Sequence, residues 1–276
     1  MRTWKLPPLN PSHEQLIECY WYCEKEVGDD SEPFPKLYPA HCSCLIITDA
    51  KHSYENEQAV TSTNGSHWLY PYLSTYTLDH SSPFRLIGIK FKVGALYSLP
   101  VPFSKNDLNT IKTSGVTELL NIDQSYVDDL LNSAFAEPGT VQRQLDTLLE
   151  PLINQSKQDK HSQLVERVMD VLRDTAIKDI GRQLFATQRT IERSFSRVTN
   201  LTMKQCQTIL RFEQILEYLH QKDISQINWV EFANEFDFSD QPHLIRSIKQ
   251  AIGRTPGEYA LQRDLTIDVY GDFEFD

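Results

Sequence analysis

The strongest constraint on the fold of this chain is a pattern of two short helices, separated by a break, that occurs twice in its C-terminal part. In residues 177–198 the second helix should begin after Thr187, a residue type that caps helix N-termini. In residues 228–250, Asn228 and Glu231 stand at the spacing of a capping box. Apolar residues recur at helical spacing in both segments, so each predicts a helix-turn-helix unit. We expect these residues to face inward: Ile191, Phe195 and Val198 in the first unit, and Val230, Phe232, Ala233, Phe236, Phe238, Leu244, Ile245 and Ile248 in the second.

The polar side of the helix after Thr187 has the residue types that read DNA bases. Arginine can bind guanine and glutamine can bind adenine, each through two hydrogen bonds in the major groove. Arginines stand at every fourth residue, which predicts one basic stripe along the helix. The alternative is an ordinary solvent-exposed helix face, which has the same composition. The candidate contacts in this unit are Gln188, Arg189, Thr190, Arg193 and Arg197.

Three stretches of this part of the chain carry a family resemblance. They read "IGRQLFATQRTIERSF", "RFEQILEYL" and "FANEFDFSDQPHLIRSIKQAIGRTPGEY". In this order they resemble the C-terminal domain of AraC/XylS-type bacterial transcription regulators, over residues 161–263. The resemblance implies two DNA-binding units joined by a linker helix over residues 202–221. The chain departs from the family pattern at Gly181, Asp237 and Pro242, where the family has Ala, Gly and a small polar residue.

Pro242 stands near the start of the second unit's recognition helix. With Ser239 or Asp240 as the N-cap, Pro242 occupies the first turn, where backbone N–H groups have no partner within the helix. The helix should therefore form, but its contact surface is poorer. We expect the first unit to make most of the contacts that recognise bases, and the second to position the protein on the DNA by contacts with backbone phosphates. The remaining candidates in the second unit are Gln241, His243, Arg246, Ser247 and Lys249.

The N-terminal half reads as a small β-barrel or sandwich followed by helices. Expected strands lie within residues 19–27, 41–49, 67–79 and 84–93, and expected helices within 127–135 and 140–153, separated by Pro138 and Gly139. The apolar face of these helices either forms a dimer contact or covers the barrel. The predicted class is therefore α+β, with a β-rich sensor or dimerisation domain (1–153), a linker (154–162), a DNA-binding domain (163–263) and an acidic tail (264–276).

Charge is unevenly distributed along the chain. The net charge of −11 disfavours indiscriminate nucleic-acid binding, but residues 177–204 carry 6 Lys and Arg against 2 Asp and Glu. The five cysteines lack zinc-site spacing, and without a secretion signal we expect reduced thiols in a cytoplasmic protein. Trp21, Trp68, Tyr70 and Tyr72 either form the core or line a ligand pocket. No motif predicts catalysis, a cofactor, a metal or a membrane span.

The function predicted from the sequence is a sequence-specific transcription regulator, and an activator is the expected kind. Its expected partners are double-stranded promoter DNA, a second copy of the chain, RNA polymerase and an unknown small-molecule effector. The alternative is a regulator-like protein that acts through protein contacts and binds DNA weakly or not at all. The acidic tail and Pro242 motivate that alternative.

Overall fold

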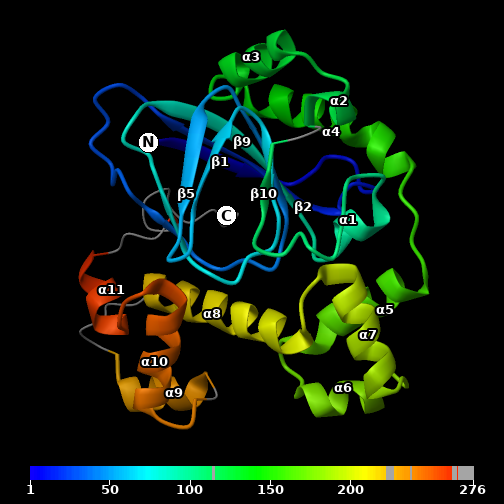
Figure 1. Ribbon diagram of the computed structural model, residues 1–276, viewed down its shortest axis with the longest axis vertical. Helices are drawn as coiled ribbons and strands as arrows, with labels where there is room; N and C mark the ends of the chain where they lie inside the picture. Colours follow the sequence, from blue (N-terminus) through cyan, green and yellow to red (C-terminus); the bar gives the residue numbers. More distant parts are fainter. Residues whose placement is uncertain (114–115, 222–226, 237, 263–265, 267–276) are drawn as a thin grey trace.

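The chain has a β-rich N-terminal domain above an all-helical C-terminal domain, which confirms the predicted α+β class (Figure 1). The computed structural model describes every residue except 114–115, 222–226, 237, 263–265 and 267–276. Asp237 and all of the predicted acidic tail except Thr266 lie outside the described residues.

Ten strands of the described chain form two antiparallel sheets. The six-stranded sheet has the order β1-β2-β9-β4-β7-β10, and the four-stranded sheet has the order β3-β8-β5-β6. The strands are β1 (Arg2–Leu6), β2 (Ile17–Lys25), β3 (Lys36–Leu37), β4 (Cys44–Thr48), β5 (Lys51–Glu55), β6 (Val60–Asn64), β7 (His67–Leu69), β8 (Tyr76–Leu78), β9 (Phe84–Phe91) and β10 (Ile111–Lys112).

Strand β9 shows how the two faces of the larger sheet differ. Side chains alternate between faces along a strand, and Ile87 and Ile89 lie in the main hydrophobic core. Leu86 and Lys90, on the opposite face, line a cavity between the two sheets. Because Lys90 pairs with a β2 residue on one side and a β4 residue on the other, one row across the sheet reads Cys19, Lys90, Cys44.

Four helices follow β9 in the chain, and their apolar residues pack in the main core. They are α1 (Ala95–Ser98), α2 (Val116–Leu120), α3 (Gln124–Ser133) and α4 (Pro138–Asn154). Val141, Leu145 and Leu149 of α4 are buried there with residues of the large sheet, so this stripe covers the sheet. Pro138 does not separate two helices as predicted. It begins α4, because a proline in the first turn costs no intrahelical hydrogen bond.

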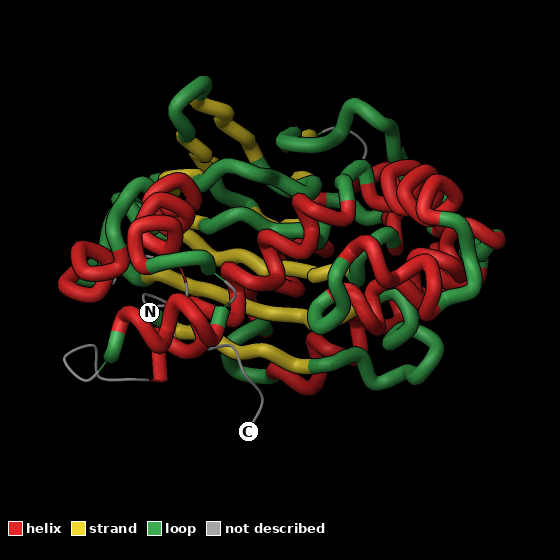
Figure 2. Tube along the Cα trace, turned by 90° about the horizontal axis from the view of Figure 1, so that it is seen from below, coloured by secondary structure: helices red, strands yellow, loops and turns green. Residues whose placement is uncertain are grey.

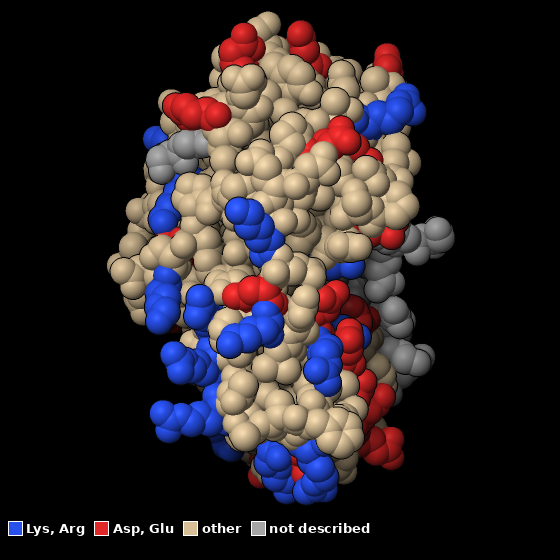
Figure 3. Space-filling model, turned by 90° about the vertical axis from the view of Figure 1, so that its right-hand side faces the viewer, with Lys and Arg blue, Asp and Glu red and all other residues tan. Residues whose placement is uncertain are grey.

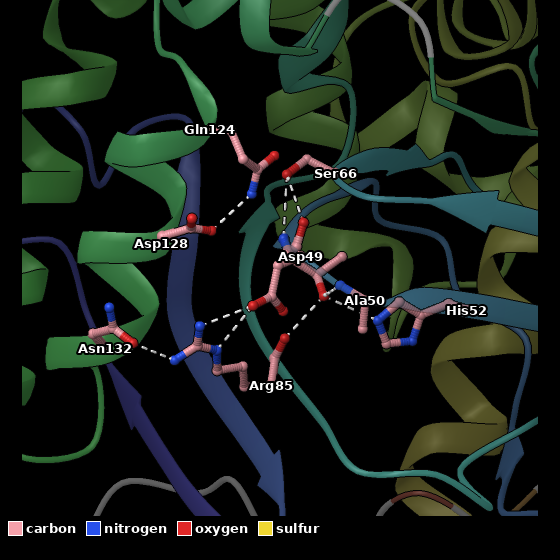
Figure 4. Close-up of polar contacts among 9 residues, drawn as sticks. Asp49, Ala50, His52, Ser66, Arg85, Gln124, Asp128 and Asn132 are labelled. Carbon is pink, nitrogen blue, oxygen red and sulfur yellow. Dashed lines mark hydrogen bonds and ion pairs between the residues drawn. The ribbon is translucent and has the colours of Figure 1, made fainter.

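Polar contacts fix α3 against the end of the large sheet (Figure 4). The Arg85 guanidinium on β9 donates to Asp49 Oδ2 at 2.8 and 3.1 Å, and to Asn132 Oδ1 of α3 at 2.6 Å. The Thr48 hydroxyl donates to the Arg85 carbonyl at 2.8 Å. One arginine therefore joins β9, the turn after β4 and a covering helix.

The C-terminal domain is built around one long helix. Its helices are α5 (Lys160–Leu172), α6 (Ile177–Gln183), α7 (Gln188–Thr199), α8 (Met203–Gln221), α9 (Trp229–Glu235), α10 (Gln241–Ile252) and α11 (Pro256–Gln262). The first half of α8 packs with α5–α7, and the second half packs with α9–α11. Figure 2, seen from below, shows these helices lying in front of the strands. Helix α8 is therefore the shared support of both helix-turn-helix units.

One predicted core position is wrong. Val230 was expected to face inward, but it is 60% exposed. Val230 precedes the buried Phe232 by two residues, about 200° around the helix, and therefore lies on the opposite, solvent-facing side. Trp229 packs instead, with its ring 5.6 Å from that of Phe232.

The two domains touch at both units. Asn200 Nδ2, after α7, donates to the Ser104 carbonyl at 2.7 Å. The Thr75 hydroxyl donates to the Ala251 carbonyl of α10. Between these points, His41 forms an ion pair with Glu213 of α8.

Candidate nucleic-acid interface

Helix α7 has a well-defined start. The Thr187 hydroxyl accepts a hydrogen bond from the Thr190 N–H at 3.2 Å, as the N-cap prediction requires. Ile191, Phe195 and Val198 are fully buried against α5 and α8. With this face in the core, the helix presents its opposite face to solvent.

That face carries the arginine stripe. Arg189, Arg193 and Arg197 are all exposed. Among the described residues, none of the three forms an ion pair with a carboxylate. In Figure 3 the Lys and Arg side chains gather along one side of the lower half, and Asp and Glu along the other. A stripe of unneutralised arginines on an exposed helix suits a polyanion such as DNA.

Gln188 is less available than its place in the sequence predicts. Its side chain is half-buried, and Nε2 donates to Glu192 Oε1 at 2.9 Å. Its Oε1 is buried without a hydrogen-bond partner, near Gly181 of α6. Base reading by Gln188 therefore requires the bond to Glu192 to break. Thr190 is exposed, and its hydroxyl lies 2.8 Å from that of Thr187.

Gly181 is required by the close approach of the turn between α6 and α7. A Cβ at this position would lie 2.9 Å from the Ala186 carbonyl oxygen, which belongs to the backbone and cannot rotate away. The departure from the alanine of the resembling family therefore has a local steric cause.

The second unit forms despite its proline. Asp240 is the N-cap of α10 and accepts a hydrogen bond from the His243 N–H at 2.7 Å, with Pro242 in the first turn. Leu244 and Ile248 are buried below it. The polar candidates of α10 divide into two groups: Arg246 and Lys249 are exposed, whereas Gln241, His243 and Ser247 are half-buried.

His243 is engaged within its own unit. Its Nδ1 lies 3.2 Å from the Ser239 hydroxyl, and its ring stands edge-on to Phe238 at 5.2 Å. The exposed cations are thus the more accessible part of this helix.

A separate cavity of about 500 Å³ lies between the two sheets, with α8 at one end. Trp21 and Tyr72 line it, and Tyr72 is also buried in a smaller core cluster with Tyr54 and Leu78. Trp68 and Tyr70 belong to the main core, which is one of the two predicted alternatives. Cys42 and Cys44 also line the cavity. Among the residues that the structure describes, no three His, Cys, Asp or Glu side chains lie together as a metal site requires.

The polar end of this cavity faces α8. Lys90 Nζ lies 2.7 Å from Glu18 Oε1, and His41 Nδ1 lies 3.3 Å from Glu213 Oε1. The second contact is an ion pair rather than an aligned hydrogen bond, since Nδ1 makes no such bond. Burial disfavours the charged imidazole, but Cys42 and Glu213 outweigh it and raise the pKa of His41 to about 10.

Sequence reasoning missed Lys105 and Asn200, which lie beside the arginine stripe. Asn200 ends α7 in a left-handed conformation, with φ of 62°, and its side chain reaches the N-terminal domain. Lys105 is an exposed loop residue nearly ninety positions before the stripe, and no local pattern connects the two.

One family model and several solved structures are similar to this chain. A family model described as a helix-turn-helix domain matches residues 180–262. ToxT from Vibrio cholerae is similar over 94% of this chain and 96% of its own, at 8% identity and a TM-score of 0.44. A structure of wild-type ToxT with bound unsaturated fatty acid is similar over 96% and 95%, at 10% identity and a TM-score of 0.46.

The AraC-like transcriptional activator CuxR is similar over 78% of this chain and 86% of its own, at 11% identity and a TM-score of 0.29. No curated protein matches the chain. None of the described helices combines the length and the apolar character that a membrane span needs.

Proposed function

Because this chain carries an AraC-type helix-turn-helix domain at residues 180–262, we propose that it is a sequence-specific transcription regulator that reads promoter DNA mainly with α7. The observation that carries this proposal is the exposed stripe of Arg189, Arg193 and Arg197, free of carboxylate partners in the described chain, on a helix with a firm N-cap. Arg189 in the first turn is placed to reach base edges, because recognition helices contact bases with their N-terminal residues.

Helix α10 is proposed to position the protein on phosphates. Arg246 and Lys249 are exposed, whereas Gln241 and His243 are half-buried. Cations that contact phosphate add affinity without sequence preference. The two units would therefore differ in role.

A gel-shift titration tests this division. Gln188→Ala with Arg189→Ala should weaken binding to a selected promoter fragment more than Gln241→Ala with His243→Ala. Loss of a two-bond base contact costs roughly 1–3 kcal/mol, or about 5- to 150-fold in Kd. The reverse order would contradict the proposal. Binding that is absent, or that does not change with salt, would favour a regulator that acts through protein contacts.

The cavity between the sheets is proposed to hold a small effector. It is lined by aromatic and apolar side chains together with polar and charged ones, and such convergent polar groups can orient a ligand in a concave site. Cys44→Trp should fill it, and small molecules that raise the melting temperature of the wild type should then have no effect. Equal stabilisation of both proteins would place the ligand elsewhere.

We also propose that the chain forms a homodimer and contacts RNA polymerase. The apolar stripe of α4 is already buried on the sheet, so the dimer contact would use another surface. Sedimentation of the chain with and without promoter DNA measures the oligomeric state. A monomer on a duplex with two half-sites would contradict the dimer.

A further inference from the structure

A groove of about 760 Å³ runs between the two domains beside α7. The N-terminal domain lines it with Tyr97, Phe103 and Lys105, and α7 and its C-cap line it with Arg193, Arg197 and Asn200. The basic stripe of α7 therefore continues onto the N-terminal domain, at Lys105.

The charged side chains that line the groove, Lys105, Arg193 and Arg197, are all cationic, and the nearby carboxylates differ in how far they are neutralised. Asp107 is buried, forms an ion pair with Lys112, and accepts from the Ser104 N–H at 2.7 Å. Asp159 accepts from the Tyr97 hydroxyl at 2.9 Å. Lys105 itself is exposed and forms no ion pair within the described residues.

Several contacts fix Lys105 relative to α7. The preceding residue, Ser104, accepts the hydrogen bond from Asn200. The Arg197 guanidinium carbon lies 5.7 Å from the centre of the Tyr97 ring. Gly94, just before α1, packs so closely on Val198 that a Cβ there would lie 2.6 Å from its Cγ1. Lys105 is thus held beside the C-terminal end of α7.

We propose that Lys105 of the N-terminal domain binds a backbone phosphate of the same duplex that α7 enters. This inference rests on the function proposed for α7. From Arg189 to Arg197 the stripe rises about 12 Å along the helix, at about 1.5 Å per residue. The major groove is about 8.5 Å deep. If Arg189 reaches base edges with the N-terminal end of α7, as recognition helices do, a cation beyond Arg197 lies outside the groove, at the level of the phosphates that border it. The exposed cations and open shape of the site fit a backbone better than a small enclosed anion.

The test is Lys105→Gln in the full chain, with Lys51→Gln as the matched control, because Lys51 is an exposed lysine on β5 of the other sheet. Dissociation constants are measured by fluorescence anisotropy on a random-sequence duplex and on the tightest fragment that the wild type selects. Removal of one phosphate contact should lower the slope of log K against log[salt] by about 0.9 on both duplexes. Lys105→Arg should restore the wild-type slope, and Lys51→Gln should leave it unchanged.

A wild-type slope for Lys105→Gln, or an equal change for Lys51→Gln, would overturn the inference. So would loss of inorganic phosphate binding by Lys105→Gln with DNA binding unchanged, because the groove would then be a small-anion site. Arg189→Ala and Arg193→Ala separate the two proposals. If they bind DNA like the wild type, the role proposed for α7 fails. If they weaken binding while Lys105→Gln does not, only the phosphate contact of Lys105 fails.

Discussion

Substitution of Gly94 by alanine tests whether the first helix-turn-helix unit is packed against the N-terminal domain as the structure shows. Gly94 has φ of 77°, a left-handed conformation that costs an L-residue roughly 1–2 kcal/mol. Its new Cβ would also lie 2.6 Å from Val198 Cγ1 across the domain contact. Overpacking of this kind costs roughly 1–3 kcal/mol. Gly94→Ala should therefore lower the free energy of unfolding by about 2–5 kcal/mol.

A double-mutant cycle separates these two costs. Val198→Ala removes the obstructing methyl and alone should cost roughly 2 kcal/mol of buried surface. In the double variant the steric cost disappears while the backbone cost remains. Its loss of unfolding free energy should therefore be smaller than the sum of the losses in the two single variants, by about 1–3 kcal/mol. Urea denaturation followed by tryptophan fluorescence and circular dichroism measures this. Gly139→Ala is the control, because nothing lies within 4 Å of that Cβ. Costs that add to within about 0.5 kcal/mol would refute the packing of Gly94 on Val198.

Three further predictions concern single sites. Gly181→Ala should lower the melting temperature despite a gain of up to about 1 kcal/mol in helix propensity, because the Cβ would meet the Ala186 carbonyl oxygen; a rise would refute that contact. Phe185, in the turn before α7, is 96% exposed with φ of 55°, so Phe185→Gly should stabilise the chain by up to about 1 kcal/mol, and a lower urea midpoint would contradict this. Burial lowers the pKa of His52 and of His67 to about 4 and that of His80 to about 3, so the unfolded chain binds more protons and stability present above pH 6.5 is lost as pH falls toward 4. In urea titrations across that range, His80→Phe should reduce the slope of the unfolding free energy against pH by the equivalent of about one proton. An unchanged slope would show that His80 is not held neutral.

The helices of the C-terminal domain were predictable because their signals are local. A capping residue, an apolar period and a turn mark α7, α9 and α10, which Thr187, Asn228 and Asp240 cap. The prediction that Val230 faces inward was wrong because the inward face of α9 begins at Trp229, which stands three and four residues before the buried Phe232 and Ala233.

The sheets were predictable only where their strands are buried. Strands β2, β4 and β9 are rich in apolar and aromatic residues. Strands β4 and β9 fall within predicted segments, and β2 begins at Ile17, two residues before its predicted segment. Strand β6, "VTSTN", is mostly exposed, and β3 and β10 have two residues each, so tertiary pairing rather than composition defines them.

In the candidate site, too, local features could be predicted from the sequence and contacts between distant segments could not. The exposure of Arg189, Arg193 and Arg197 follows from helix periodicity. The engagement of Gln188 with Glu192 and the position of Lys105 depend on packing between segments, which one sequence does not reveal. Residues of one helix could therefore be assigned to a face, but their neighbours from other segments could not.

The placement of α8 gives the proposed effector a physical route to the DNA-binding units. Glu213 lies near the middle of this helix, facing His41 at the polar end of the cavity. Leu210 on one side of it belongs to the core of the first unit, and Leu216 on the other belongs to the core of the second. A ligand that displaces His41 would leave the Glu213 carboxylate without this ion-pair partner. Glu213 belongs to α8, the only described helix that contributes to the cores of both helix-turn-helix units. Because protein cores are close-packed, a shift of α8 would be transmitted to α7 and α10 together rather than absorbed by one unit. A ligand in the cavity would thus change the relative positions of the two recognition helices. Affinity for DNA that both units contact together would change more than affinity for DNA that only one unit contacts.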